Sequence, residues 1–231
     1  MRLFVLCFIV SLLFCSSGAF AANPDGLYLM TRSWPGSSLE ILGWLFKNGQ
    51  VCSKPMGDLA HFDFQKAAAR DPNSTGTYSI SGKNMIIKWA NGKSETGELE
   101  PDKSCFFWQM GLFCPADPFQ KNAKINGVFS GGASAGYGKA ANATSITFSS
   151  NGTYKLEQVG AVHSDTSAGT QLYAGSSGSE TGTYDLSGTT LILKSSGGKS
   201  RQIVSFPYDD GTKGPAPRRI FFDGAMLKRI D

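Results

Sequence analysis

One stretch in which hydrophobic and polar residues alternate occurs twice in this chain. Residues 76–94 read GTYSISGKNMIIKWANGKS, and residues 182–200 read GTYDLSGTTLILKSSGGKS. The copies start at positions 76 and 182, an offset of 106, and share the G-T-Y opening, a central Ser-Gly and a closing Gly-Lys-Ser. A fixed internal period indicates a repeat architecture. The sequence therefore predicts two homologous halves.

Each copy of this stretch predicts a β-hairpin. Met85, Ile87 and Trp89 fall on one face of an extended run, and Leu191 and Leu193 repeat the pattern in the second copy. Alternation with a period of two, bounded by Ser-Gly and by Asn-Gly or Gly-Gly, is typical of two strands joined by a polar turn.

The rest of the chain predicts short strands with tight turns, such as those at Asn48-Gly49 and Asn151-Gly152. Residues 59–70 break the pattern and predict a short helix, with Asp58 as its N-cap. Residues 164–180 are expected to form a Ser/Thr/Gly-rich loop, and residues 115–124 a linker. The expected strands are 26–29, 39–46, 50–52, 76–80, 85–90, 95–100, 105–108 and 112–114 in the first half, and 127–129, 144–148, 153–163, 182–186, 190–195, 201–207, 220–222 and 225–227 in the second.

These elements predict an all-β protein of two tandem antiparallel meander barrels, each of about eight strands, with one short helix in the first half. A meander of eight strands closes on itself and so removes its exposed edges. A two-sheet sandwich is the alternative. We expect a signal peptide over residues 1–22, a first barrel repeat over 23–120 and a second over 121–231.

The first 22 residues have the pattern of a signal peptide. Arg2 supplies the positive charge, residues 3–14 form an apolar core too short to span a bilayer, and Ala19-Phe20-Ala21 is a cleavage signal. We therefore expect a cleaved protein that is secreted or periplasmic; an uncleaved anchor is the alternative. Without Arg2, the chain has 21 basic and 18 acidic residues. The basic residues do not cluster, so nucleic acid is not an expected partner. No other segment is apolar enough to predict a transmembrane helix.

Three cysteines remain after the signal peptide: Cys52, Cys105 and Cys114. An oxidising compartment predicts one disulfide and one unpaired thiol. Cys105 and Cys114 flank a short turn and are the preferred pair, across a hairpin. A bond from Cys52 to either of them is the alternative.

Two sets of residues suggest chemistry. Ser134 lies in a G-x-S-x-G motif at residues 132–136, but the residues after it do not predict the helix that a nucleophile elbow needs, and His163 is the only later histidine. Asp58, His61 and Asp63 carry metal-ligating atoms, yet one His with two carboxylates is a weak zinc pattern. We therefore expect no enzyme activity, no metal and no cofactor; a hydrolase using Ser134 is an alternative.

All four tryptophans, Trp34, Trp44, Trp89 and Trp108, lie in the first half. A tryptophan cluster is suited to a ligand cavity or a carbohydrate-stacking surface, so these four are the candidate ligand-binding residues. The alternative is that they fill the core of that half.

Each half has a G-x-aromatic first strand, with Tyr28 in one and Phe129 in the other, followed by Asn-Gly and G-T-Y hairpins. The second half ends in a basic strand with Lys228 and Arg229. In these motifs both halves resemble the lipocalin-like, or calycin, group of small β-barrels, which carry Gly-x-Trp at the first of these positions. The chain as a whole also resembles secreted bacterial proteins. The lipocalin resemblance implies a barrel that holds one small ligand.

Together these patterns predict an exported, non-catalytic binding protein. Its partner would be an apolar small molecule in a cavity, or a protein or glycan on two long insertions at residues 53–75 and 164–181. A structural cell-envelope protein without a ligand is the main alternative. Dense cores with no cavity above about 300 Å³ would favour that alternative.

Overall fold

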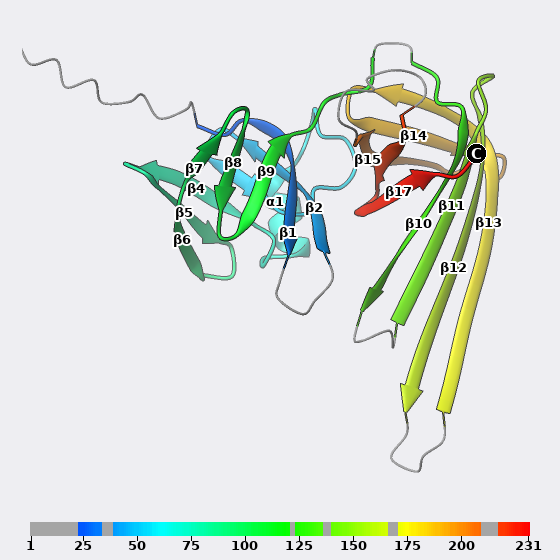
Figure 1. Ribbon diagram of the computed structural model, residues 1–231, viewed down its shortest axis with the longest axis horizontal. Coiled ribbons are helices and arrows are strands. Elements are labelled where there is room, and N and C mark those ends of the chain that lie inside the picture. Colours follow the sequence, from blue (N-terminus) through cyan, green and yellow to red (C-terminus); the bar gives the residue numbers. More distant parts are fainter. Residues whose placement is uncertain (1–22, 34–38, 121–122, 136–139, 166–170, 209–216) are drawn as a thin grey trace, which may run out of the picture.

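The computed structural model describes residues 23–33, 39–120, 123–135, 140–165, 171–208 and 217–231. The expected signal peptide and Trp34 lie outside these residues. The described chain is almost entirely β-structure and folds into two sheets that lie beside each other (Figure 1). Both sheets are antiparallel and barrel-like, as the alternating pattern predicts.

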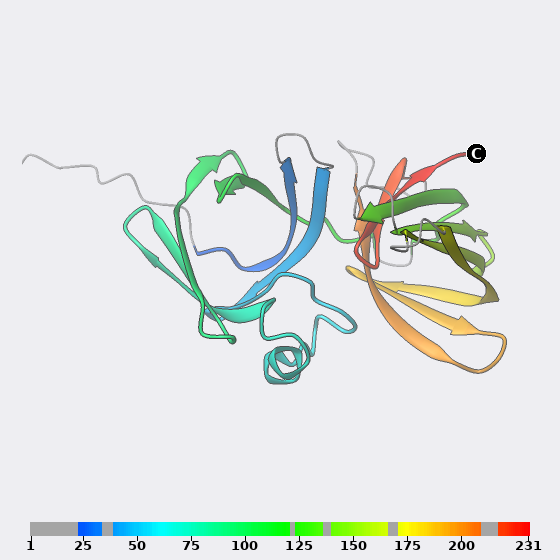
Figure 2. The same ribbon diagram turned by 90° about the horizontal axis from the view of Figure 1, so that it is seen from below.

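The first sheet has nine strands in the order β6-β5-β4-β3-β2-β1-β9-β8-β7. It curves strongly when the molecule is viewed from below (Figure 2). Its open edges are β6 and β7, which the sequence suggested as a single strand. The strands are β1 (Gly26–Ser33), β2 (Leu39–Lys47), β3 (Gln50–Cys52), β4 (Thr75–Ser81), β5 (Asn84–Trp89), β6 (Ser94–Glu98), β7 (Glu100–Asp102), β8 (Cys105–Trp108) and β9 (Gly111–Pro115).

The second sheet is a closed barrel of eight strands in sequence order, with β17 pairing back to β10. Strands β10 to β13 continue well beyond the barrel as a long arm (Figure 1). The strands are β10 (Gly127–Ala135), β11 (Ala140–Phe148), β12 (Thr153–Asp165), β13 (Gln171–Ser187), β14 (Thr190–Ser195), β15 (Ser200–Pro207), β16 (Arg219–Phe222) and β17 (Ala225–Arg229).

Two local predictions are wrong. Helix α1 spans Phe64–Arg70 and is capped by Asp63, whose carboxylate accepts a hydrogen bond from Lys66 N; Asp58 instead bonds Ala60 N in the preceding turn. The expected loop over residues 164–180 is mostly strand, because β13 pairs with β12 from Gln171 onward. Backbone pairing with a neighbouring strand there prevails over a composition typical of loops.

The repeat is visible in the strand register. Tyr78 lies opposite Ile87 in β4–β5, and Tyr184 lies opposite Leu193 in β13–β14, at the same offset as in the sequence. Each tyrosine hydroxyl donates to a backbone carbonyl just before the first strand of its half: Tyr78 to Pro24 at 2.5 Å and Tyr184 to Ile125 at 2.6 Å. The G-T-Y motif therefore fixes the entry of the chain into each sheet.

Replacement of Tyr184 by phenylalanine tests this role. The variant leaves the Ile125 carbonyl without this donor, so we expect a loss of about 1–2 kcal/mol in the free energy of unfolding at pH 7. Burial raises the pKa of Tyr184 to about 12. The raised pKa means that the neutral phenol stabilises the fold fully below pH 10, and that this contribution is lost as the pH rises toward 12. The difference in the free energy of unfolding between wild type and Tyr184→Phe, measured by urea titration, should therefore become smaller between pH 10 and pH 12. A gap that stays constant from pH 7 to pH 12 would contradict this account.

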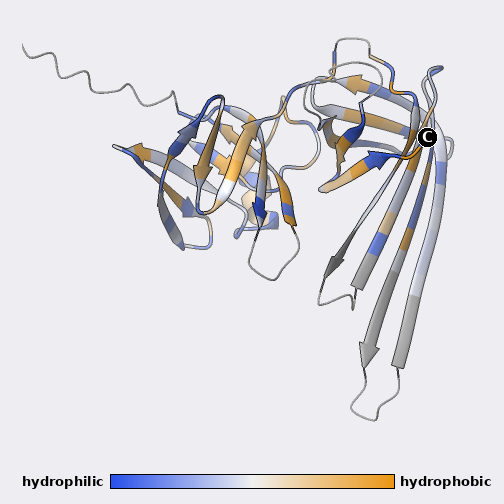
Figure 3. Cartoon of the chain, viewed as in Figure 1, coloured by the Kyte–Doolittle hydropathy of each residue, from blue (hydrophilic) through white to orange (hydrophobic). Residues whose placement is uncertain are grey.

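Each half has its own filled interior, and a third cluster joins the halves. Hydrophobic residues alternate with hydrophilic ones along the strands (Figure 3). The interior of the first half includes Phe46, Met85 and Phe113, and that of the second includes Phe129 and Phe148; all five are almost fully buried. The third cluster contains Leu27, Leu29, Leu45, Cys52, Leu59, Phe64, Val204, Phe206 and Phe221.

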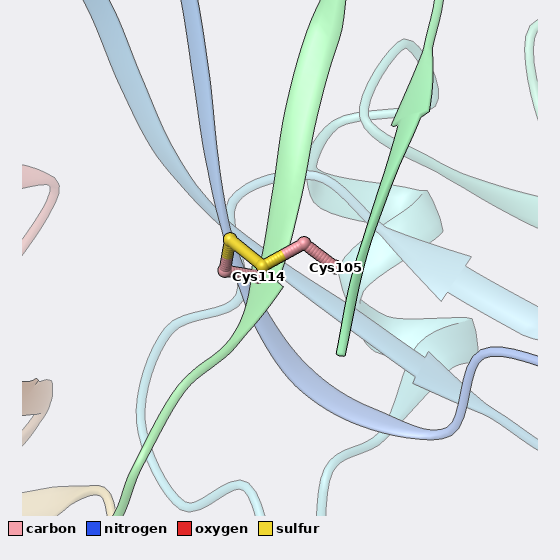
Figure 4. Close-up of a disulfide and its surroundings, with 2 residues drawn as sticks. All are labelled: Cys105 and Cys114. Atoms are coloured by element: carbon pink, nitrogen blue, oxygen red, sulfur yellow. A yellow bond between two sulfur atoms is a disulfide. The ribbon is translucent and has the colours of Figure 1, made fainter. Parts of the chain in front are cut away.

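The preferred disulfide is confirmed. Cys105 on β8 and Cys114 on β9 are bonded across the hairpin, with their Cα atoms 4.3 Å apart (Figure 4). The remaining thiol, Cys52, is fully buried and accepts a hydrogen bond from Thr75 Oγ1 at 3.6 Å. Burial raises the pKa of the Cys52 thiol, which keeps it protonated and unreactive.

Candidate functional site

A cleft of about 690 Å³ lies where the two halves meet. The first half contributes the start of β1, the β2–β3 turn and the segment before α1, and the second half contributes the β13–β14 turn with nearby residues of β14 and β15. This volume is within the range usual for small-molecule sites. The lining residues are Asp25, Gly26, Leu27, Leu45, Phe46, Lys47, Asn48, Asp58, Leu59, Ala60, His61, Ser187, Gly188, Thr189, Thr190, Ile192 and Gln202.

The third hydrophobic cluster holds the cleft walls in place. Phe206 on β15 and Phe221 on β16 stack with ring centroids 4.8 Å apart and face the first half. On β2, Gly43 has no side chain, and a Cβ there would lie 3.5 Å from Phe221 Cζ. The Phe221 ring thus lies within van der Waals reach of the β2 backbone at Gly43. The outward-facing side chains Leu27 and Leu45 extend this contact to the cleft.

The cleft combines an apolar base with a polar rim. Leu27, Leu45 and Leu59 are each at least nine-tenths buried and supply the apolar surface. The rim carries amide, hydroxyl and charged groups, among them Gln202 and Lys47. Lys47 Nζ donates to the Ala60 carbonyl at 3.3 Å and so ties the segment before α1 to β2. The arrangement suits a ligand with an apolar body and a polar end.

The Asp58, His61 and Asp63 set does not converge on one point. Asp58 Oδ2 and His61 Nδ1 are 2.8 Å apart at the rim, and this hydrogen bond lowers the pKa of the Asp58 carboxyl. Asp63 is used as the cap of α1. Among the described residues, no group of three or more His, Cys, Asp or Glu side chains is placed to hold a metal ion. Asp58 and His61 thus serve as rim groups of the cleft.

Three of the four candidate tryptophans lie in the interior of the first half. Trp44 packs on Trp89 and Trp108, with ring centroids 5.8 and 6.1 Å away, and all three are at least nine-tenths buried. None of the three lines the cleft. Their packing is that of core side chains, as the alternative interpretation expected, and ligand contact by them stays a prediction.

The backbone around Ser134 differs from a nucleophile elbow. Ser134 lies inside β10, opposite Ala141 of β11, and His163 lies on β12, one strand further on. Strands are spaced by about 4.8 Å, so the two backbones are roughly 10 Å apart. An elbow serine requires a sharp turn from strand to helix, whereas this serine lies within an antiparallel hairpin strand.

A polar cluster that sequence analysis missed lies at one end of the second barrel. Tyr154 OH donates to the Glu180 carboxylate, and Arg201 Nη2 donates to the same oxygen at 3.3 Å. Burial, reinforced by this hydrogen bond, raises the pKa of Tyr154 well above its usual value. The sign that could have indicated this cluster is the alternation of the strands. Glu180 lies opposite the buried Leu156, so its side chain is on the inward face of β13.

A scan of protein-family models and searches of curated proteins and of solved structures gave no match to this chain. The lipocalin resemblance therefore stays a hypothesis. In the described part of the chain, no helix has the length and hydropathy needed to cross a membrane.

Proposed function

We propose that this chain is an exported, non-catalytic binding protein that holds a small amphipathic molecule in the cleft between its two halves. The observation that carries the proposal is the position of the cleft. Both interiors are filled by buried side chains, while about 690 Å³ is open between the halves, over a leucine-rich base. A ligand there would contact both repeats at once.

Export is supported by two features. Residues 1–22 have the signal-peptide pattern, and the Cys105–Cys114 bond is of the kind that persists in oxidising compartments. The alternative of a structural envelope protein is favoured by the densely filled interiors of the two halves. The cleft supports the binding proposal over the structural one, because a purely structural pair of repeats has no need of an open volume lined by both.

Native mass spectrometry of the protein purified from its natural host tests the binding proposal. We expect a small-molecule mass excess that disappears under denaturing conditions. Ser187 is exposed and lines the cleft, so Ser187→Trp should occupy the volume and abolish the excess. Ser196→Trp is the matched control, since Ser196 is exposed on the same half but does not line this cleft. A bare protein mass for the wild type, or an excess that survives Ser187→Trp, would overturn the proposal.

A further inference from the structure

A row of three polar residues crosses three neighbouring strands of the second barrel. Arg219 on β16 lies directly opposite Lys228 on β17, and Lys228 lies opposite Ser130 on β10. Opposed residues on antiparallel strands point to the same face, with Cβ atoms about 5 Å apart. The next residues along two of these strands, Ile220 and Leu227, are fully buried inside the barrel, so the row points outward. We call Arg219, Lys228 and Ser130 the basic row.

The two cationic residues of the basic row lie directly opposite each other in the sheet, and neither is paired with an acidic side chain among the described residues. Like charges directly opposite each other on a sheet are destabilising. Two other arginines of the same barrel are paired with acidic residues: Arg229 Nε lies 2.8 Å from Asp231 Oδ1, and Arg201 pairs with Glu180 at 3.3 Å. Arg219 and Lys228 are both exposed. Their pairing therefore costs stability unless something else compensates the charge.

Two further features favour an anionic partner at this place. The Arg219 guanidinium lies over the Tyr208 ring, 5.9 Å from its centroid, which limits its orientation. The positive charge of the mature chain is also concentrated in this half. Residues 121–231 contain 12 basic and 8 acidic residues, whereas residues 23–120 contain 9 and 10.

We propose that the basic row binds a tetrahedral oxyanion, a phosphate or sulfate group. The Arg219 guanidinium supplies a planar pair of donors, the Lys228 ammonium supplies a second charge, and the Ser130 hydroxyl adds a neutral donor. The anion stabilises the barrel by relieving the repulsion between the two cations. The basic row is separate from the cleft, because none of its residues lines the cleft. Its ligand group is either a free ion or ester, or the headgroup of an anionic lipid.

Thermal unfolding with inorganic phosphate and sulfate tests the site on the full mature chain. We expect the melting temperature to rise by several degrees, and by more than in sodium chloride of equal ionic strength. Arg219→Gln and Lys228→Gln should each weaken phosphate binding at least tenfold, since each removes a charge-assisted hydrogen bond. Lys194→Gln is the matched control, because Lys194 is an exposed lysine of β14 in the same barrel and should leave the response intact.

A second readout separates a binding role from a structural one. At low salt without phosphate or sulfate, Arg219→Gln and Lys228→Gln should melt at the same temperature as wild type or higher, because the like-charge pair is gone. Three results would overturn the proposal. They are a lower melting temperature in both variants, a rise in the wild-type melting temperature that is as large in sodium chloride as in phosphate or sulfate, and a full phosphate response in Lys228→Gln.

Sedimentation with phosphatidylcholine vesicles that contain about 30% of the anionic lipid phosphatidylglycerol identifies the source of the group. Co-sedimentation that Lys228→Gln abolishes assigns the site to a lipid headgroup. A phosphate response without co-sedimentation assigns it to a free ion or ester.

Discussion

Replacement of Gly182 by alanine is expected to destabilise the second barrel by about 3 kcal/mol, the upper end of the usual cost of overpacking. A Cβ at this position would meet the Lys194 carbonyl oxygen and lie 2.8 Å from Ser195 Cα. Both atoms belong to the backbone of β14, so no side-chain rotation can relieve the contact. The duplicated Gly76 is in the same situation, with Trp89 Cα 2.9 Å from the added atom. The first residue of the G-T-Y motif is therefore set by the close approach of two strands.

Gly178→Ala provides the control for this prediction, since it makes the same change on the same strand. A Cβ on Gly178 would have no atom within 4 Å, so its effect should stay within about 0.5 kcal/mol. Urea unfolding followed by circular dichroism gives both values. Equal stabilities for Gly182→Ala and Gly178→Ala would show that β13 and β14 separate without cost, against the structure.

Replacement of Phe221 by alanine is expected to uncouple the two halves. The side chain is 3% exposed and lies between Phe206 and the β2 backbone at Gly43, so its removal should cost about 3–5 kcal/mol. All tryptophans lie in the first half, and tryptophan fluorescence therefore reports on that half alone. In the wild type, fluorescence and circular dichroism should give one coincident unfolding transition. In Phe221→Ala the two transitions should separate.

Phe222→Ala is the matched control for the interface. Phe222 is the next residue on β16 and points into the second barrel, where it is 2% exposed. Its removal should lower the midpoint but keep the two transitions coincident, because the contact between the halves remains. Coincident transitions at an unchanged midpoint in Phe221→Ala would mean that the third hydrophobic cluster contributes no coupling. The shape of the cleft would then not depend on it.

Sequence alone was sufficient wherever structure is decided by local alternation and turn chemistry. The hairpins around Tyr78 and Tyr184, the return at Asn48-Gly49, and the disulfide between Cys105 and Cys114 all follow from residues close together in the chain. The tandem all-β architecture followed from the repeat, because a repeated hairpin implies a repeated sheet.

Features that depend on distant partners were not predictable in the same way. Residues 171–180 lack the β-branched residues typical of strands, and they are held in β13 by pairing with β12. The helix start depended on which of two aspartates, Asp58 or Asp63, turns its carboxylate to the first free amide groups. The cleft is formed by residues from both halves, such as Leu45 and Gln202, and no local pattern indicates that they meet.

The confinement of the buried tryptophans to the first interior has a consequence for how the chain avoids exchanging its repeats. Two hairpins of the same register in one chain are equivalent partners during folding, and misassembly between similar repeats is a common failure of tandem proteins. The residue that matches Trp89 of the first half is Ser195 of the second. An exchanged hairpin would overfill one barrel with an indole ring and leave a void in the other, so the unequal side chains select each repeat's own partner.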